Sequence, residues 1–260
     1  MGMWRPRIIP VLLLRGEGLV KSTRFAGHRY IGDPINTVRI FNDLGADEVV
    51  LLDIDATRQQ RLVDVRLIRD IGEEANMPLA VGGGIRSLDD IRVVLGAGAE
   101  KVVLGTIAAE QPGFVQEAAN TFGSSAIVVC IDARGRGQHR RAHVRNGATP
   151  LSSTPLALAQ TLQANGAGEI IIQSIDRDGA MQGYDLELVR EIAEAVDVPV
   201  IALGGAGHLD HLESAFHEAG ASGLGAGSLF VFHGPLRGVL VSYPLPSQLV
   251  RQRRPCSNVC

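Results

Sequence analysis

Short apolar runs recur along the whole chain, and segments with helical spacing separate them. The runs are continuous and rich in β-branched residues, which is typical of strands buried on both faces of a parallel sheet. They cover residues 7–14, 47–55, 78–83, 101–106, 126–133, 169–176, 198–205 and 222–227. The helical patterns between them cover residues 34–46, 62–75, 88–99, 156–168 and 186–196. This alternation predicts an α/β fold with a parallel sheet.

Two matching glycine-rich segments indicate an internal repeat. VGGGIRS begins at Val81 and LGGAGHL begins at Leu203, so the two segments lie about half a chain apart. Eight strands with a two-fold repeat favour closure into a single (β/α)8 TIM barrel made of two half-barrels. We expect the barrel to span residues 1–243. Residues 244–260 lack a core pattern, and we expect them to form a loosely ordered tail.

The same glycines suggest a ligand. Glycine lets backbone N–H groups approach an anion, and a helix that begins there adds the positive end of its dipole. One such segment in each half predicts a ligand with a phosphate at each end. The loops after the first and fifth strands, residues 15–34 and 134–151, are rich in cations and would lie on the catalytic face of a barrel. A solvated hairpin around Asn146 and Gly147 explains the second loop equally well.

Composition and charge argue against several other classes of protein. The net charge of −3 gives no reason to expect nucleic acid, and no apolar run is long enough for a membrane span. Cys130 lies in an apolar run and reads as a buried structural thiol. The three cysteines make no disulfide framework, which favours a cytoplasmic location. The sequence has no His/Cys cluster with metal-ligand spacing, and His208 and His211 read as solvent-facing. We expect no metal, and we also expect no cofactor.

Several ionisable residues stand where barrel strands end. Asp132 closes the fifth strand, where burial raises the pKa of a carboxyl group toward general acid–base work, although it could instead bond loop N–H groups. Asp176 and Asp178 follow the sixth strand, and Asp55 takes the equivalent place after the second; an Asp-Gly turn is the alternative for Asp178. Lys21, in the first loop, is either a phosphate clamp or an ordinary surface lysine.

A second charged group falls at the opposite ends of the strands. Arg7, Glu48, Lys101 and Glu169 each begin an apolar run or follow its first residue. Two cations and two anions there can form a closed ring of salt bridges across the bottom of the barrel. By spacing alone, the ring would be ordinary charge on the face that serves stability.

Together these residues resemble the cyclase subunit of imidazole glycerol phosphate synthase, the HisF family. The resemblance covers roughly residues 5–243 and rests on ordered motifs. They include RIIP, LVKSTRF, ADEVVLLDI, VGGGIRS, AEKVVLGT, AIVVCIDA, GEIIIQSIDRDGAMQGYD, VIALGGAG and GSLF. The resemblance implies a barrel whose top face binds a phosphorylated small molecule with two phosphates. It also implies a HisH-type glutaminase partner, whose ammonia enters through the bottom of the barrel.

The family's functional positions can be carried over residue by residue. The resemblance makes Asp132 one of two catalytic aspartates, Lys21 the lysine of a mobile loop, and the charged ring an ammonia gate. Asp178 remains a further catalytic candidate. The implied phosphate sites comprise Gly84, Gly105 and Thr106 in one half, and Gly179, Gly205, Gly227 and Ser228 in the other.

The second catalytic aspartate of the family is missing, because Leu13 stands in its place. Leucine transfers no proton, and losing half of an acid–base pair typically costs about 10²–10⁴ in rate. Gly105, Asp55 and Leu203 also depart from the family pattern, whereas all four gate residues are present. A kept gate and an altered catalytic face suggest a diverged paralogue. It resembles the cyclase-like proteins that work with a glutaminase and an ATP-dependent sugar amidotransferase to make acetamidino sugars of surface polysaccharides.

Two alternatives remain open. The chain could be an authentic imidazole glycerol phosphate synthase cyclase of histidine biosynthesis, in which Asp55 or Asp178 replaces the lost aspartate. It could also be a non-catalytic subunit that binds a phosphorylated ligand and activates the glutaminase. A sugar-phosphate isomerase fits less well, because that chemistry also uses a carboxylate on the first strand and needs no ammonia gate.

Overall fold

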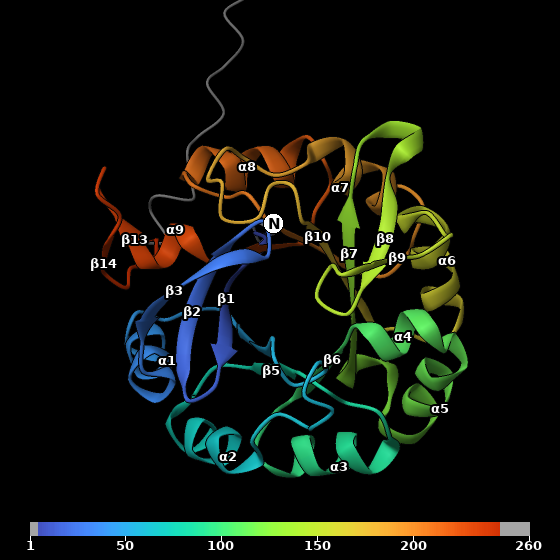
Figure 1. Cartoon of the computed structure of the whole chain (residues 1–260), viewed down its shortest axis with the longest axis horizontal. Coiled ribbons are helices and arrows are strands. Elements are labelled where there is room, and N and C mark those ends of the chain that lie inside the picture. Colours follow the sequence, from blue (N-terminus) through green and yellow to red (C-terminus); the bar gives the residue numbers. More distant parts are fainter. Residues whose placement is uncertain (1–4, 245–260) are drawn as a thin grey trace, which may run out of the picture.

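The computed structural model describes residues 5–244. Eight parallel strands close into a barrel, in which β1 pairs with both β4 and β12 and the remaining strands follow in chain order (Figure 1). The barrel strands are β1 (Arg7–Arg15), β4 (Val49–Asp53), β5 (Leu79–Gly82), β6 (Lys101–Leu104), β7 (Ile127–Arg134), β10 (Glu169–Ser174), β11 (Val200–Leu203) and β12 (Gly223–Ala226). This confirms the predicted (β/α)8 barrel. The predicted tail lies outside the described residues except for Pro244.

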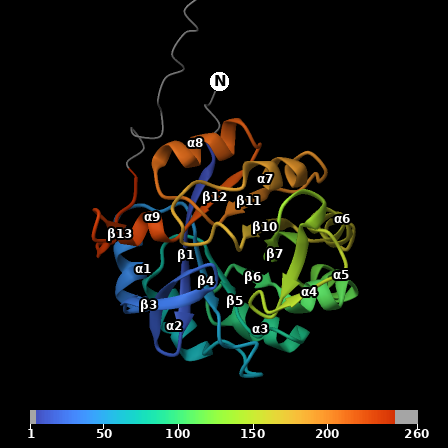
Figure 2. The same ribbon diagram turned by 45° about the horizontal axis from the view of Figure 1, so that its top comes forward.

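Helices surround the strands as an outer ring (Figure 1; Figure 2). They are α1 (Pro34–Asp43), α2 (Val65–Glu74), α3 (Leu88–Gly96), α4 (Thr106–Glu110), α5 (Pro112–Phe122), α6 (Pro155–Ala164), α7 (Leu186–Ala193), α8 (Leu209–His217) and α9 (Ser228–Val231). Short 3-10 turns cover Ser124–Ala126 and Gly137–His139. Local sequence fixes several starts: the Ser87 side chain and Asp90 form a capping box at the start of α3. Among the described residues, no helix has the length and apolarity needed to cross a bilayer.

Two apolar layers hold the barrel together. One fills the space between the strands and the helices, and it includes the fully buried rings of Phe41 and Phe230. The other fills the inside of the barrel with side chains such as Ile9, Val50 and Ile171. The inside is therefore a packed core, as is usual for this fold.

The prediction of an irregular loop over residues 15–34 is wrong, because the segment forms an antiparallel hairpin. Its strands are β2 (Gly18–Thr23) and β3 (Ala26–Gly32), and β2 pairs with the end of β1. The chain turns at Arg24 and Phe25, which both adopt positive φ. This pairing gives hydrogen-bond partners to the backbone N–H and C=O groups of the segment and extends the sheet above the mouth of the barrel.

The basic segment 134–151 is also a hairpin, as one of the two sequence readings expected. β7 continues into it and pairs with β8 (Arg141–Val144), which in turn pairs with β9 (Thr149–Pro150). Asn146 and Gly147 form its turn with positive φ. In Figure 1 the two hairpins lie on opposite sides of the barrel axis. A third, short hairpin near the C-terminal end joins β13 (Phe232–His233) and β14 (Gly238–Val239).

Candidate active site at the mouth of the barrel

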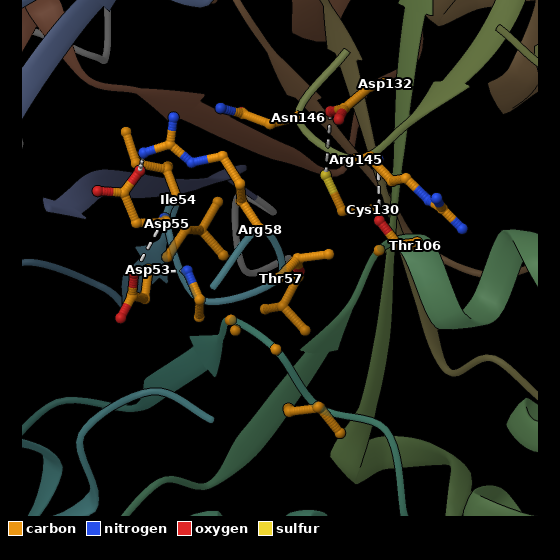
Figure 3. Close-up of a pocket in the computed structure, with 18 of the residues that line it drawn as sticks. Asp53, Ile54, Asp55, Thr57, Arg58, Thr106, Cys130, Asp132, Arg145 and Asn146 are labelled. Atoms are coloured by element: carbon orange, nitrogen blue, oxygen red, sulfur yellow. Dashed lines mark hydrogen bonds and ion pairs between the residues drawn. The ribbon is translucent and has the colours of Figure 1, made fainter. Parts of the chain in front are cut away.

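Two cavities lie at the C-terminal ends of the barrel strands. The larger one has a volume of about 940 Å³ and contains Asp132, Thr106 and Asp55 in its lining (Figure 3). The smaller one has a volume of about 30 Å³, which is room for one or two water molecules. Leu13 and Gln173 line both cavities and therefore lie between them.

Asp132 lies on the inner face of β7 and lines the larger cavity. Burial raises the pKa of its carboxyl group to about 7, and the nearby Asp178 adds to the rise. The Cys130 thiol donates to Asp132 Oδ1 at 3.8 Å, which opposes the rise. A carboxyl group with a pKa near neutrality suits general acid–base chemistry. Burial raises the pKa of Cys130 well above its usual range, so this thiol is a poor nucleophile, although Cys130 remains partly exposed and lines the larger cavity.

Leu13 occupies the inner face of β1, where its backbone pairs with Leu52 of β4. Its side chain lines the larger cavity together with Asp132. The structure thus places an acidic group and an alkyl group in one cavity, where the resemblance implies two acidic groups.

The first set of predicted phosphate-binding residues borders the larger cavity. Gly84, Gly105 and Thr106 all line it, and Gly105 directly precedes α4. Thr106 Oγ1 accepts a hydrogen bond from the backbone N–H of Arg145 at 3.0 Å, which ties the β8–β9 hairpin to this rim. Gly84 has φ +69°, and a Cβ there would lie 1.8 Å from the carbonyl oxygen of Arg61. A side chain at this position is therefore excluded.

The second set of predicted phosphate-binding residues lines the smaller cavity. It comprises Gly179, Gly205, Gly227 and Ser228. Lys21 of β2 occupies this region: its Nζ donates to the carbonyl oxygen of Val11, and a Cβ on Gly227 would lie 2.1 Å from Nζ. Burial lowers the pKa of Lys21 to about 8, and Asp178 partly opposes the fall. The structure thus places Lys21 in a buried strand position, with its amine inside the second predicted phosphate site.

The other candidate aspartates have local partners. Asp178 Oδ2 accepts from Ser22 Oγ at 2.7 Å and from the N–H of Phe25 at 3.2 Å, so it anchors the first hairpin. Asp176 accepts from the N–H of Gly135 at 2.9 Å. Asp55 forms ion pairs with Arg15 and Arg58, which also line the larger cavity. Asp178 and Asp55 line different cavities, and Asp55 is the one that shares a cavity with Asp132.

The predicted ring of salt bridges exists at the opposite end of the barrel. Arg7 binds both Glu48 and Glu169, and Lys101 Nζ lies 3.0 Å from Glu48 and 3.1 Å from Glu169. The Glu48 side chain is only 2% exposed. Each charge of the ring therefore has two partners of opposite sign, which is what buried charges require.

The two histidines have local roles at the start of α8. His208 caps the helix by accepting from the N–H of Asp210, and its side chain is largely exposed, as predicted. His211 accepts from the N–H of Gly207, and burial lowers its pKa. Neither residue belongs to a possible metal cluster within residues 5–244.

Comparison with known proteins agrees with this geometry. Residues 7–236 match the family model described as histidine biosynthesis protein. The chain belongs to this family. It is 44% identical to an imidazole glycerol phosphate synthase subunit HisF of Leptospira borgpetersenii, across 93% of this chain and 96% of the relative. It is 44% identical to subunit hisF2 of Pseudomonas aeruginosa, across 93% and 97% of the two chains. Subunit hisF3 of Vibrio vulnificus is 42% identical across 95% of each chain.

Sequence reasoning missed much of the rim of this HisF-type barrel. Arg58, Arg61 and Arg86 line the larger cavity beside the predicted glycines. The segment DIDATRQQR after the second strand carried the signal, because its cations follow a strand end directly.

Tyr243 was also missed; its hydroxyl accepts from the N–H of Asp47 at 3.1 Å and lies 3.0 Å from the carbonyl oxygen of Ile8. This contact ties the end of the described chain to the bottom of the barrel.

The raised pKa of Asp132 predicts a specific pH dependence of stability. Between about pH 4 and 7 the folded chain holds this proton, whereas the unfolded chain has released it. The free energy of unfolding therefore falls as pH rises through this window and loses nothing more from this group above it. Between about pH 4.5 and 8, the free energy of unfolding of Asp132→Asn should rise relative to that of the parent by on the order of 2–4 kcal/mol, because the parent alone loses the contribution of this proton. Urea unfolding of both proteins at about pH 4.5 and 8 measures this difference. If the free energies of unfolding of the two proteins change with pH in parallel, the raised pKa of Asp132 is contradicted.

Proposed function

We propose that this chain is a HisF-type barrel subunit that receives ammonia from a HisH-type glutaminase. The ammonia enters through the charged ring of Arg7, Glu48, Lys101 and Glu169 and meets a phosphorylated ligand in the larger cavity. This proposal is supported by the contrast between the two ends of the barrel. At the N-terminal end the charged ring is complete, whereas at the C-terminal end an alkyl side chain, Leu13, lines the cavity that contains Asp132. In this proposal the chain serves the amidation of a surface-polysaccharide sugar together with an ATP-dependent sugar amidotransferase.

The inside of the barrel supports a path for a small neutral molecule. Between the ring and the mouth, the interior side chains are apolar and include Ile9, Val50, Val128 and Ile171. Such a lining penalises ions far more than neutral ammonia, because an unpaired charge loses its hydration there. The path is filled by side chains, so passage needs local rearrangement of the ring and of the layer above it.

A complete synthase with a displaced acid has weaker support. Asp55 lines the cavity that contains Asp132. However, Arg15 and Arg58 each bind one of its two carboxylate oxygens. These contacts suit a structural or ligand-orienting carboxylate better than a group that exchanges protons with a substrate. Asp178 is likewise engaged by the first hairpin.

Binding to a glutaminase tests the proposal. We expect the full chain to bind a HisH-type glutaminase and to stimulate its hydrolysis of glutamine. Arg5→Glu reverses a half-exposed charge beside the N-terminal end of β1, where Arg5 pairs with Asp47, and it should weaken binding by about 10-fold or more. Arg136→Glu makes the same change at the opposite end, on the β7–β8 hairpin, and should leave binding unchanged.

The outcomes separate the proposal from its rival. Calorimetry measures binding of the glutaminase. The proposal is contradicted if the chain does not bind it. Docking at the N-terminal end is contradicted if Arg5→Glu and Arg136→Glu weaken binding equally. Stimulated glutamine hydrolysis without any transfer of ammonia to an acceptor would identify the chain as a non-catalytic activator.

A further inference from the structure

The imidazole of His28 is a polar group without a partner on the wall of the larger cavity. His28 lies on β3, in the first hairpin, and lines this cavity. Its Nε2 atom is buried, and within residues 5–244 neither ring nitrogen has a hydrogen-bond partner. Buried polar atoms of side chains nearly always have a partner, so an exception needs a physical reason.

His28 is unusual even beside the other exception in the described part of the chain. That exception is Nε of Arg140. The terminal nitrogens of the same guanidinium bind Asp185 and Glu191, so the side chain of Arg140 is held by carboxylates. The side chain of His28 makes no hydrogen bond or ion pair within the described residues, and its hydrogen-bonding capacity is unused.

The backbone around His28 is held on both sides. On the N-terminal side, the carboxylate of Asp178 accepts from the backbone N–H of Phe25 at 3.2 Å. On the C-terminal side, the guanidinium of Arg29 donates to the carbonyl oxygen of Arg237 at 3.1 Å. The fold therefore sets the position of His28 on the cavity wall, whereas no hydrogen bond sets the orientation of its ring.

The other two hairpin residues that line the cavity offer no free polar side chain. Ser22 Oγ donates to Asp178 at 2.7 Å. Phe25 is apolar and packs toward the second hairpin, where a Cβ on Gly147 would lie 3.0 Å from Phe25 Cδ2. His28 is thus the side chain through which the first hairpin can hydrogen-bond a molecule in the cavity. A half-turn about its Cβ–Cγ bond exchanges the two edges of the ring.

The chemistry of imidazole indicates which group His28 would bind. In its neutral form an imidazole donates from one nitrogen and accepts at the other, and a hydroxyl group also does both. A hydroxyl can therefore pair with His28 whichever edge of the ring faces the cavity. Anionic oxygens are served better by the guanidinium groups of the lining, such as those of Arg58 and Arg86.

We propose that His28 is a specificity-determining residue that hydrogen-bonds a hydroxyl group in the part of the ligand beyond its phosphate. This inference rests on the phosphorylated ligand of the proposed function and adds the residue that recognises its hydroxyl groups. It also implies that the fold does not need this imidazole. An alkyl side chain at position 28 would remove a buried nitrogen that has no partner, which is neutral or stabilising.

Calorimetric binding of two phosphate monoesters tests the role of His28 without any partner protein. The probes are ribose 5-phosphate and ethyl phosphate, which has no hydroxyl group on its alkyl chain. We expect the unmodified chain to bind ribose 5-phosphate about 10-fold or more tightly than ethyl phosphate. His28→Leu should weaken binding of ribose 5-phosphate by about 10-fold, with affinity for ethyl phosphate within about 2-fold of the parent. His28→Gln keeps a donor and an acceptor and should retain most of the preference.

A matched variant and a stability measurement separate ligand recognition from a structural role. His233→Leu makes the same change at an exposed position on β13 that does not line the cavity, and it should leave both affinities unchanged. The urea midpoint of His28→Leu should equal or exceed that of the parent.

Several outcomes would overturn the inference. An unchanged preference in His28→Leu would remove the role of His28, and equal losses in His28→Leu and His28→Gln would contradict a hydrogen bond. Weaker binding of both probes together with a lower urea midpoint would assign His28 to the fold. If the unmodified chain binds neither probe, the phosphate site of the proposed function fails and this inference fails with it. Glutaminase binding tests the rest of that function separately.

Discussion

Lys101→Glu is expected to lower the free energy of unfolding by about 3–5 kcal/mol, because it leaves three carboxylates and one cation in a largely buried ring. Glu48 and Glu169 each lose one of their two cationic partners and gain an acidic neighbour. Urea unfolding at neutral pH measures the loss. Lys101→Arg preserves the charge and should cost much less.

The same variant bears on ammonia transfer. If the ring is the entrance, Lys101→Glu must change the coupled transfer of ammonia from glutamine under conditions where the variant remains folded. Unchanged transfer would contradict the gate. A stability loss equal to that of Lys101→Arg would contradict the ring as a group of mutually dependent charges.

Leu13→Asp is expected to produce the largest functional change. It places a second carboxyl group in the cavity that holds Asp132, at the position where the resemblance implies the missing acid. With the ribonucleotide substrate of imidazole glycerol phosphate synthase and saturating ammonium, turnover should rise by about 10²–10⁴ over the parent, the usual contribution of a positioned acid or base. The rise should appear in a steady-state assay of the cyclised product.

Leu13→Asn is the control for this prediction, because it has nearly the same shape as Leu13→Asp and transfers no proton. Equal turnover by the two variants would show that polarity rather than proton transfer limits the reaction. No increase in either would show that the departures at Gly105, Asp55 and Leu203 also block cyclisation.

Much of the fold followed from the apolar pattern, because parallel barrel strands are buried on both faces and carry unbroken β-branched runs. Each of the eight predicted runs coincides with a barrel strand, and β1 and β7 extend one residue beyond their runs. The helices α4 and α5 were harder to assign, since Pro112 and Gly113 interrupt the helical pattern where one helix ends and the next begins. The first hairpin was missed because its strands are short and glycine-containing, and they are fixed by pairing with β1.

The charged ring shows what strand register can predict. Arg7, Glu48, Lys101 and Glu169 fall at or next to the starts of their strands, so closure of the barrel brings them together. The position of Lys21 did not follow in the same way. Its burial depends on the hairpin packing over Gly227, a contact between residues from opposite ends of the chain. The ion pairs of Asp55 with Arg15 and Arg58 likewise depend on how the end of β1 meets the loop after β4.

The most direct test of the account is an assay of the unmodified chain with the synthase's ribonucleotide under saturating ammonium, with binding of the ribonucleotide measured in parallel. We expect the ribonucleotide to bind and to turn over about 10²–10⁴-fold more slowly than in Leu13→Asp, because in this account Leu13 stands where the second member of an acid–base pair would face Asp132. Turnover at a rate useful to a cell would contradict the account and establish a synthase in which another group replaces the missing aspartate.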